Sequence, residues 1–173
     1  MTDGVDVVTL GEALAGFVAR EIGPLELASG FDRHIVGAEF NTAVGLSRLG
    51  HRAAFIGRVG DDALGRAVQR ALRAEAVDDR YVRVDDARPT GVLIRSRRGG
   101  AASEVVYHRA GSAGGALGPG DVDAARDAIA GARWLHLSGV TPALSDTCRE
   151  AVERAIEIAS RSHVPIALDV NLR

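Results

Sequence analysis

Cysteine is nearly absent from this 173-residue sequence, because Cys148 is the only one. A single cysteine excludes a disulfide within the chain, which fits a protein of the reducing cytoplasm. Cys148 falls at an apolar position of a helical pattern, so we expect a buried thiol. The N-terminal segment has neither a basic region nor a long apolar run. The sequence therefore predicts neither a signal peptide nor a membrane span.

A strong net charge is also missing. Lys and Arg number 21 against 23 Asp and Glu, which gives a net charge of −2, and the arginines are not clustered in a stripe. This balance gives no indication of a nucleic-acid partner. The apolar fraction of 46% and the charged fraction of 25% are ordinary for a soluble globular protein, and the length is sufficient for one good core.

Strand-like apolar runs alternate with helical patterns along most of the chain. We expect strands at 7–10, 53–56, 81–84, 134–137 and 165–170, and helices at 39–49, from Asp61 or Asp62, at 121–130 and from Ser145. Alternation of this kind predicts an α/β fold, with a parallel sheet flanked by helices.

Three polar residues near the first strand and the first helix are candidates for ligand contacts. Glu12 directly follows the first strand, and ligands of open α/β sheets bind outside the carboxyl ends of strands. Gly37 allows a sharp turn into the first helix, whose first turn carries Glu39 and Asn41 next to free N–H groups. The alternatives are a solvated loop acid for Glu12, a complement to the helix dipole for Glu39 and a helix cap for Asn41.

A glycine-rich loop spans residues 110–120, with the sequence AGSAGGALGPG. It contains no lysine, so it does not match a phosphate-binding loop, and the segment after the first strand does not match a dinucleotide fingerprint. We therefore expect a flexible connection.

Four further runs have strand-like character with one solvent-exposed face, at 17–22, 31–36, 92–97 and 104–109. The last two are joined through Gly99-Gly100, which indicates a hairpin in a half-exposed flap.

Several motifs resemble those of the ribokinase-like (PfkB-type) carbohydrate kinases. The first is VGAEFN at 36–41, followed by glycines at 45, 50, 57 and 60, and the others are GRVGDD, PTGV, YHRAGSA, LHLSGVTPAL and DVNLR. Together they cover essentially the whole chain. Within the family, GAEFN, YHRAGSA, SGVTPAL and DVNLR are most similar to 2-keto-3-deoxygluconate kinases.

The resemblance implies a Rossmann-like domain over residues 1–173, with a small β-sheet lid made of segments at about 15–36 and 90–110. In the family the lid closes over the sugar and often forms a homodimer contact. The chain resembles the N-terminal part of such a kinase. The catalytic aspartate, the anion hole and most of the ATP pocket would lie beyond it, so we expect no catalytic or metal-binding residue here and an inactive isolated chain.

The resemblance also implies roles for individual residues. Gly37 would pass its backbone close to the sugar, Asn41 would bind its hydroxyls, Tyr107 and Arg109 would reach from the lid, and Arg173 would contact the substrate from the sheet edge. Two arginines suit a carboxylate, because guanidinium groups form fork-shaped, charge-assisted hydrogen bonds. The alternatives are a lid-surface salt bridge for Arg109 and a solvated terminus for Arg173.

The expected activity is transfer of a phosphate from ATP, with Mg²⁺, to a sugar or sugar acid, with 2-keto-3-deoxygluconate as the leading substrate. A kinase of a neutral sugar, such as a ribokinase or fructokinase, and a truncated non-catalytic sugar-binding protein remain alternatives. Three departures from the family pattern leave the exact sugar open. Val36 replaces the first glycine of the usual pair, His108 replaces a second tyrosine, and Leu93 replaces an aromatic residue.

Overall fold

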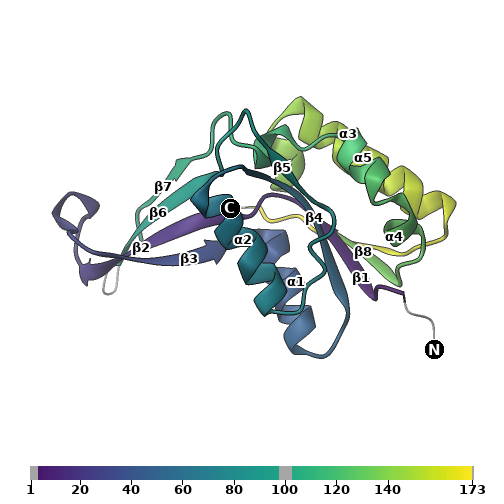
Figure 1. Ribbon diagram of the computed structural model, residues 1–173, viewed down its shortest axis with the longest axis horizontal. Helices are drawn as coiled ribbons and strands as arrows, with labels where there is room; N and C mark the ends of the chain where they lie inside the picture. The colour runs from purple at the N-terminus through teal and green to yellow at the C-terminus, as the bar shows by residue number, and fades with distance from the viewer. Residues whose placement is uncertain (1–3, 98–102, 173) are drawn as a thin grey trace.

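The computed structural model describes residues 4–97 and 103–172, which form an α/β core and a separate small sheet (Figure 1). The core is a five-stranded sheet in the order β5-β4-β1-β8-β9, and every strand pair in it is parallel. Its strands are β1 (Val7–Leu10), β4 (Ala53–Gly60), β5 (Val82–Asp85), β8 (Trp134–Ser138) and β9 (Ile166–Asp169). The predicted parallel sheet flanked by helices is confirmed.

Helices cover both faces of this sheet, as Figure 1 shows. One face packs against α1 (Ala38–Arg48) and α2 (Ala63–Ala74), and the other against α3 (Pro119–Ala124), α4 (Arg126–Ala130) and α5 (Asp146–Arg161). Successive residues of β4 alternate between the faces, so that Phe55 joins the first core and Ile56 the second. Cys148 is fully buried in the second core, as expected. No helix in the described ranges is long and apolar enough to cross a membrane.

The strand order reverses direction at β1. The chain runs from β1 outward to β4 and β5, then returns to β8 on the other side of β1 and continues to β9. Such a reversal opens a crevice outside the carboxyl ends of the two central strands, which is where open α/β sheets bind their ligands. Glu12 lies two residues beyond the end of β1 and therefore at this crevice.

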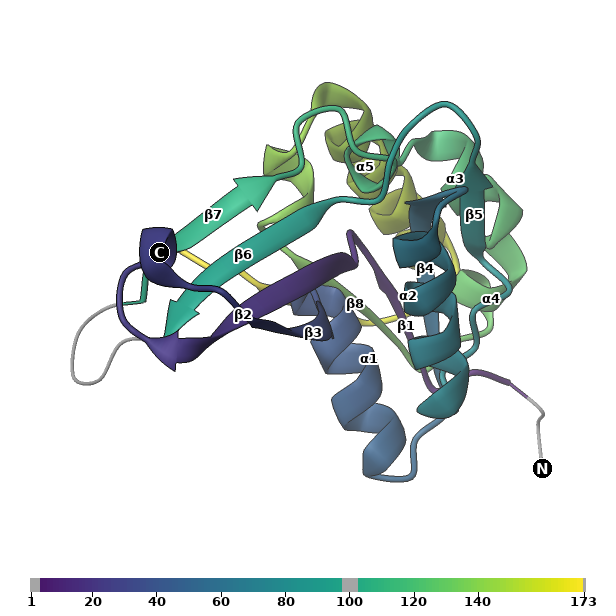
Figure 2. The ribbon, with the colours of Figure 1, turned by 60° about the vertical axis from the view of Figure 1, so that its left-hand side comes forward.

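The second sheet has four strands in the order β3-β2-β6-β7. They are β2 (Leu14–Ile22), β3 (Phe31–Val36), β6 (Val92–Arg97) and β7 (Val105–His108). Figure 2 shows this small sheet extending away from the core. β2 follows β1 almost directly and β3 leads into α1, so both ends of this excursion are anchored at the crevice. β6 and β7 pair antiparallel as predicted, while Gly99-Gly100 lies outside the described residues.

Two local predictions are wrong. The helix expected from Asp121 to Ala130 is two short helices, because the chain breaks at Ala125. Asp121 lies in the first turn of α3, where its carboxylate accepts the N–H of the N-cap residue Gly118. The glycine-rich loop is not a flexible connection, because Ser112, Ala113 and Leu117 are almost completely buried.

Two glycines in helices provide a matched test of this packing. A Cβ on Gly65 of α2 would lie 2.1 Å from the Gly60 carbonyl oxygen, whereas a Cβ on Gly45 of α1 would meet nothing within 4 Å. We expect Gly65→Ala to lower the free energy of unfolding by about 2 kcal/mol or more, because the backbone must shift. Gly45→Ala should raise it by about 0.5–1 kcal/mol, because alanine favours a helix over glycine.

Urea unfolding of the two variants and the wild type measures both changes. Equal effects from the two substitutions would contradict the close approach of α2 to the end of β4.

Candidate functional site

A cavity of about 390 Å³ lies between the crevice of the core sheet and one face of the small sheet. Five of the six residues that the sequence analysis selected line it, namely Glu12, Gly37, Asn41, Tyr107 and Arg109. The sixth, Arg173, lies outside the described residues. The cavity therefore brings together residues from the end of β1, the start of α1 and the end of β7, which are up to 97 positions apart in the chain.

The start of α1 forms one wall of the cavity. Gly37 is the N-cap with φ +154°, and a Cβ there would lie 2.4 Å from the Glu12 carbonyl oxygen, so only glycine fits. Asn41 lies one turn later and is exposed to the cavity. Its side chain does not cap α1, since no side-chain cap exists at this helix start. The Asn41 amide is therefore available to a ligand.

Glu12 is buried, so the alternative of a solvated loop acid is wrong. The Ser112 hydroxyl donates to Glu12 Oε1 at 2.5 Å, and Arg109 Nη2 lies 2.5 Å from Glu12 Oε2. Arg109 is thus already paired with an acid of the core. This differs from the alternative of a lid-surface salt bridge, because the partner belongs to the end of β1 and the side chain of Arg109 is only 21% exposed.

The Glu12–Arg109 pair leaves some hydrogen-bonding capacity unused. Neither Glu12 Oε2 nor Arg109 Nε has a hydrogen-bond partner among the described residues, although both atoms are buried. The contact between the two groups is therefore an ion pair without good hydrogen-bond angles. Tyr107 lies beside it, with the Arg109 guanidinium carbon 5.4 Å from the ring centroid. An arginine in this setting can still direct N–H groups to a bound oxyanion.

Glu39 is a second buried carboxyl group at the cavity, and it lies in the first turn of α1. Burial raises the pKa of Glu39, while the hydroxyl of Thr141, which donates to Glu39 Oε1, opposes this shift. Thr141 begins the short helix η3 (Thr141–Ala143), directly after β8. Glu39 thus ties the start of α1 to the segment after β8, across the crevice.

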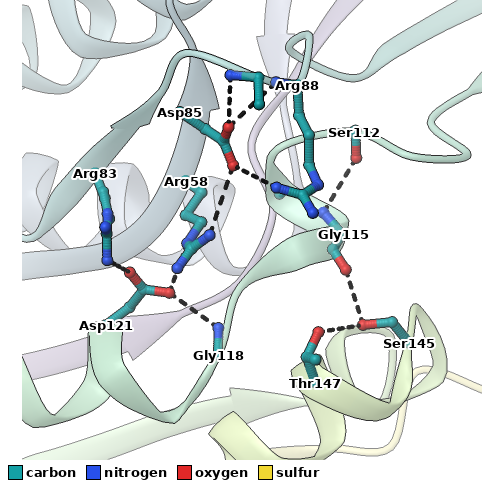
Figure 3. A network of polar contacts seen from close by, with 12 residues as sticks. Arg58, Arg83, Asp85, Arg88, Ser112, Gly115, Gly118, Asp121, Ser145 and Thr147 are labelled. Atoms are coloured by element: carbon teal, nitrogen blue, oxygen red, sulfur yellow. Dashed lines mark hydrogen bonds and ion pairs between the residues drawn. The ribbon is translucent and has the colours of Figure 1, made fainter.

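The glycine-rich loop is held in place by a polar network (Figure 3). Ser145, the N-cap of α5, donates to the Gly115 carbonyl oxygen at 2.8 Å, and Ser112 accepts the Gly115 N–H at 3.1 Å. At the far end of the loop, Asp121 binds Arg58 Nε at 2.7 Å. These bonds fix the position from which Ser112 reaches Glu12.

Sequence reasoning missed three polar residues of this site. Ser112 and Thr141 support the two buried acids, and Arg95 of β6 lines the cavity. The first two carried no signal, because a hydroxyl in a loop is common. Arg95 did carry one, since it is two residues from Leu93 and therefore on the same face of its strand.

Removal of Arg109 should be costly for stability, because it leaves Glu12 buried without a cation. We expect Arg109→Ala to lower the free energy of unfolding by about 3 kcal/mol, the low end for a broken buried pair, as Arg109 is partly exposed. The double variant Glu12→Gln with Arg109→Ala should recover part of this loss. Urea unfolding of the double-mutant cycle measures the coupling.

Arg97→Ala is the matched control, because Arg97 is an exposed arginine of β6, and its effect should stay within about 0.5 kcal/mol. Additive losses in the cycle would show that Glu12 and Arg109 are not coupled.

Glu39 should make stability fall as pH rises. Its native pKa is raised above 4.5, so the native state holds the proton more tightly than the unfolded state does. The resulting stability is complete below pH 4.5 and is lost as pH rises through the native pKa, by at most about 1.4 kcal/mol per pH unit. The wild type should therefore lose stability relative to Glu39→Gln, which cannot ionise.

Unfolding free energies of both proteins from pH 4.5 to 8 test this. In Thr141→Val the pKa of Glu39 should be higher still, because Thr141 lowers it in the wild type. The loss of stability should therefore continue to higher pH in this variant. Parallel curves for the wild type and Glu39→Gln would count against a raised pKa.

Comparisons with known proteins agree with this architecture. A sequence model described as pfkB family carbohydrate kinase matches residues 5–173. The 2-dehydro-3-deoxygluconokinase of Thermoproteus tenax is 37% identical over 171 residues, which are 98% of this chain and 51% of that protein. That name is a synonym for a 2-keto-3-deoxygluconate kinase.

Solved structures give the same result. The PfkB protein of Polaromonas sp. JS666 has a TM-score of 0.93 at 36% identity, covering 98% of this chain and 57% of its own. A sugar kinase of Pyrococcus horikoshii, solved in complex with ATP, has a TM-score of 0.87 at 30% identity, covering 96% of this chain and 53% of its own. The chain spans about half the length of these relatives. It belongs to the pfkB family of carbohydrate kinases.

Proposed function

We propose that this chain supplies the sugar-binding part of a kinase that phosphorylates a 2-keto-3-deoxy sugar acid, with 2-keto-3-deoxygluconate as the preferred substrate. The observation that carries the proposal is the cavity that joins Asn41, Tyr107 and Arg109 at the crevice of the sheet. Its volume of about 390 Å³ is within the range of small-molecule sites. An amide, a phenol and guanidinium groups are suitable partners for a ligand that carries hydroxyls and a carboxylate.

The similarity to the Thermoproteus tenax enzyme supports an acid rather than a neutral sugar. The charges of the cavity support it independently, because arginines line it from two strands of the small sheet, Arg95 from β6 and Arg109 after β7. A neutral sugar would gain little from a guanidinium group at the cavity, whereas a carboxylate forms charge-assisted hydrogen bonds with one.

We infer that ATP is the phosphate donor and that Mg²⁺ accompanies it. The family and the ATP complex of the Pyrococcus horikoshii relative support the nucleotide. The cavity residues do not suit Mg²⁺, because the two carboxylates that line it, Glu12 and Glu39, are already engaged by Arg109, Ser112 and Thr141. The cavity is therefore assigned to the sugar, and no described residue is assigned to the metal.

The same engagement bears on catalysis. A general base must be free to accept the proton of the attacking hydroxyl. Glu12 is ion-paired with Arg109, and Glu39 is buried with its carboxyl group engaged by the Thr141 hydroxyl. We propose that neither acts as the base and that this chain alone does not transfer phosphate.

Calorimetric titration of the chain with 2-keto-3-deoxygluconate and with D-fructose tests the proposed function. The acid should bind more tightly than fructose. Asn41→Ala should weaken binding of both ligands about tenfold, which corresponds to a lost hydrogen bond of about 1–1.5 kcal/mol. Stability should change by less than about 0.5 kcal/mol, because Asn41 is exposed.

Gly45→Ala is the control for α1, since Gly45 is exposed one turn further along the same helix and does not line the cavity. Its affinities should equal those of the wild type. Tighter binding of fructose than of the acid would favour a neutral-sugar kinase. Release of ADP when ATP and Mg²⁺ are added would show that the chain is active alone.

A further inference from the structure

The cavity contains four side chains that can carry charge, and three of them are engaged with the protein itself. Glu12 and Arg109 form a buried ion pair, and Glu39 is buried against Thr141. Burial favours the neutral form of Glu39, in line with its raised pKa. The fourth is Arg95, on the exposed part of β6. The charges of Glu12 and Arg109 therefore offset each other, and Arg95 is the cavity guanidinium with no acidic partner among the described residues.

The strand register places Arg95 at the end of the cavity furthest from the core. Leu93 pairs with Tyr107 and Arg95 pairs with Val105, and all four line the cavity. Arg109 continues β7 in the opposite direction, toward Glu12. Arg95 and Arg109 are therefore about four residues, or about 13 Å of strand, apart on one face of the small sheet. Their long side chains can approach one small ligand from its two ends.

The Arg95 side chain makes few polar contacts with the described part of the protein. Among the residues that the structure describes, its guanidinium makes one hydrogen bond, from Nη2 to Ser103 Oγ at 3.4 Å. A guanidinium has five N–H donors in a planar fork, so most of its capacity is unused. The neighbouring Ser96 points to the opposite face, where it is buried and bonded to Glu104. Arg95 is thus fixed in direction by its strand, and the bond to Ser103 is the one hydrogen bond of its tip within the described residues.

We propose that Arg95 is the specificity-determining residue that recognises the carboxylate of the sugar acid, while Arg109 mainly balances the charge of Glu12 inside the cavity. This assignment rests on the proposed function and deepens it. It places the acid end of the ligand at the outer end of the small sheet and the remaining hydroxyls next to Asn41 and the end of β1. An arginine that is already neutralised gives little preference for an anion, whereas an unpaired one gives a strong preference.

The test is the affinity of the chain for 2-keto-3-deoxygluconate relative to D-fructose, measured by calorimetric titration. Arg95→Gln should weaken binding of the acid about tenfold and leave fructose unchanged, because only the acid presents a charge to Arg95. Arg95→Lys keeps the charge without the fork, and should lose about threefold. Arg97→Gln is the matched control, since Arg97 is on the same strand but does not line the cavity, and it should match the wild type.

Two failures are distinguishable. A wild-type preference for the acid that survives in Arg95→Gln would overturn the role of Arg95 and leave the proposed function in place. No wild-type preference for the acid, or binding of neither ligand at millimolar concentration, would overturn both. Thermal melting of each variant confirms folding, because Arg95 is an exposed residue whose replacement should not change stability.

Discussion

The ion pair between Glu12 and Arg109 is the interaction on which the site depends. It joins the end of a core strand to the end of the small sheet, across 97 residues of chain. A carboxylate at this position is costly to bury unless a cation and hydrogen bonds compensate it, and here Arg109 and Ser112 supply both. The position of the small sheet over the crevice is thus coupled to the charge balance of the core.

The glycines of three separate motifs make room for Glu12. A Cβ on Gly91 would lie 2.7 Å from Glu12 Oε1, one on Gly114 would lie 2.3 Å from Glu12 Cγ, and one on Gly37 would meet its carbonyl oxygen. Gly11 has the same relation to Glu39, whose carboxyl carbon would be 2.4 Å from an added Cβ. Glycine-rich segments that could suggest a phosphate site therefore serve here to enclose two carboxyl groups.

The sequence was sufficient to predict strands and helix starts, which depend on local pattern. It was not sufficient to predict burial and pairing that depend on residues far away in the chain. The alternation of runs was sufficient for the parallel sheet, and Asp62 and Ser145 cap α2 and α5 because their side chains accept helix N–H groups three residues ahead. The burial of the loop at 110–120 could not be read locally, since Ser112 is held by an acid 100 positions earlier. For the same reason the sequence did not indicate that Arg109 pairs with Glu12, although both residues were candidates.

The separation of the two arginines would set the direction of the proposed sugar acid in the cavity. If the carboxylate lies at Arg95, the hydroxyls at the other end of the molecule lie at the carboxyl ends of β1 and β8. That edge is where open α/β sheets perform their chemistry, so the acceptor hydroxyl would be the one remote from the acid. The small sheet would then select the ligand by its charge, and the core would hold the end that reacts. Selection and reaction would use different ends of one cavity, and a change in one could leave the other intact.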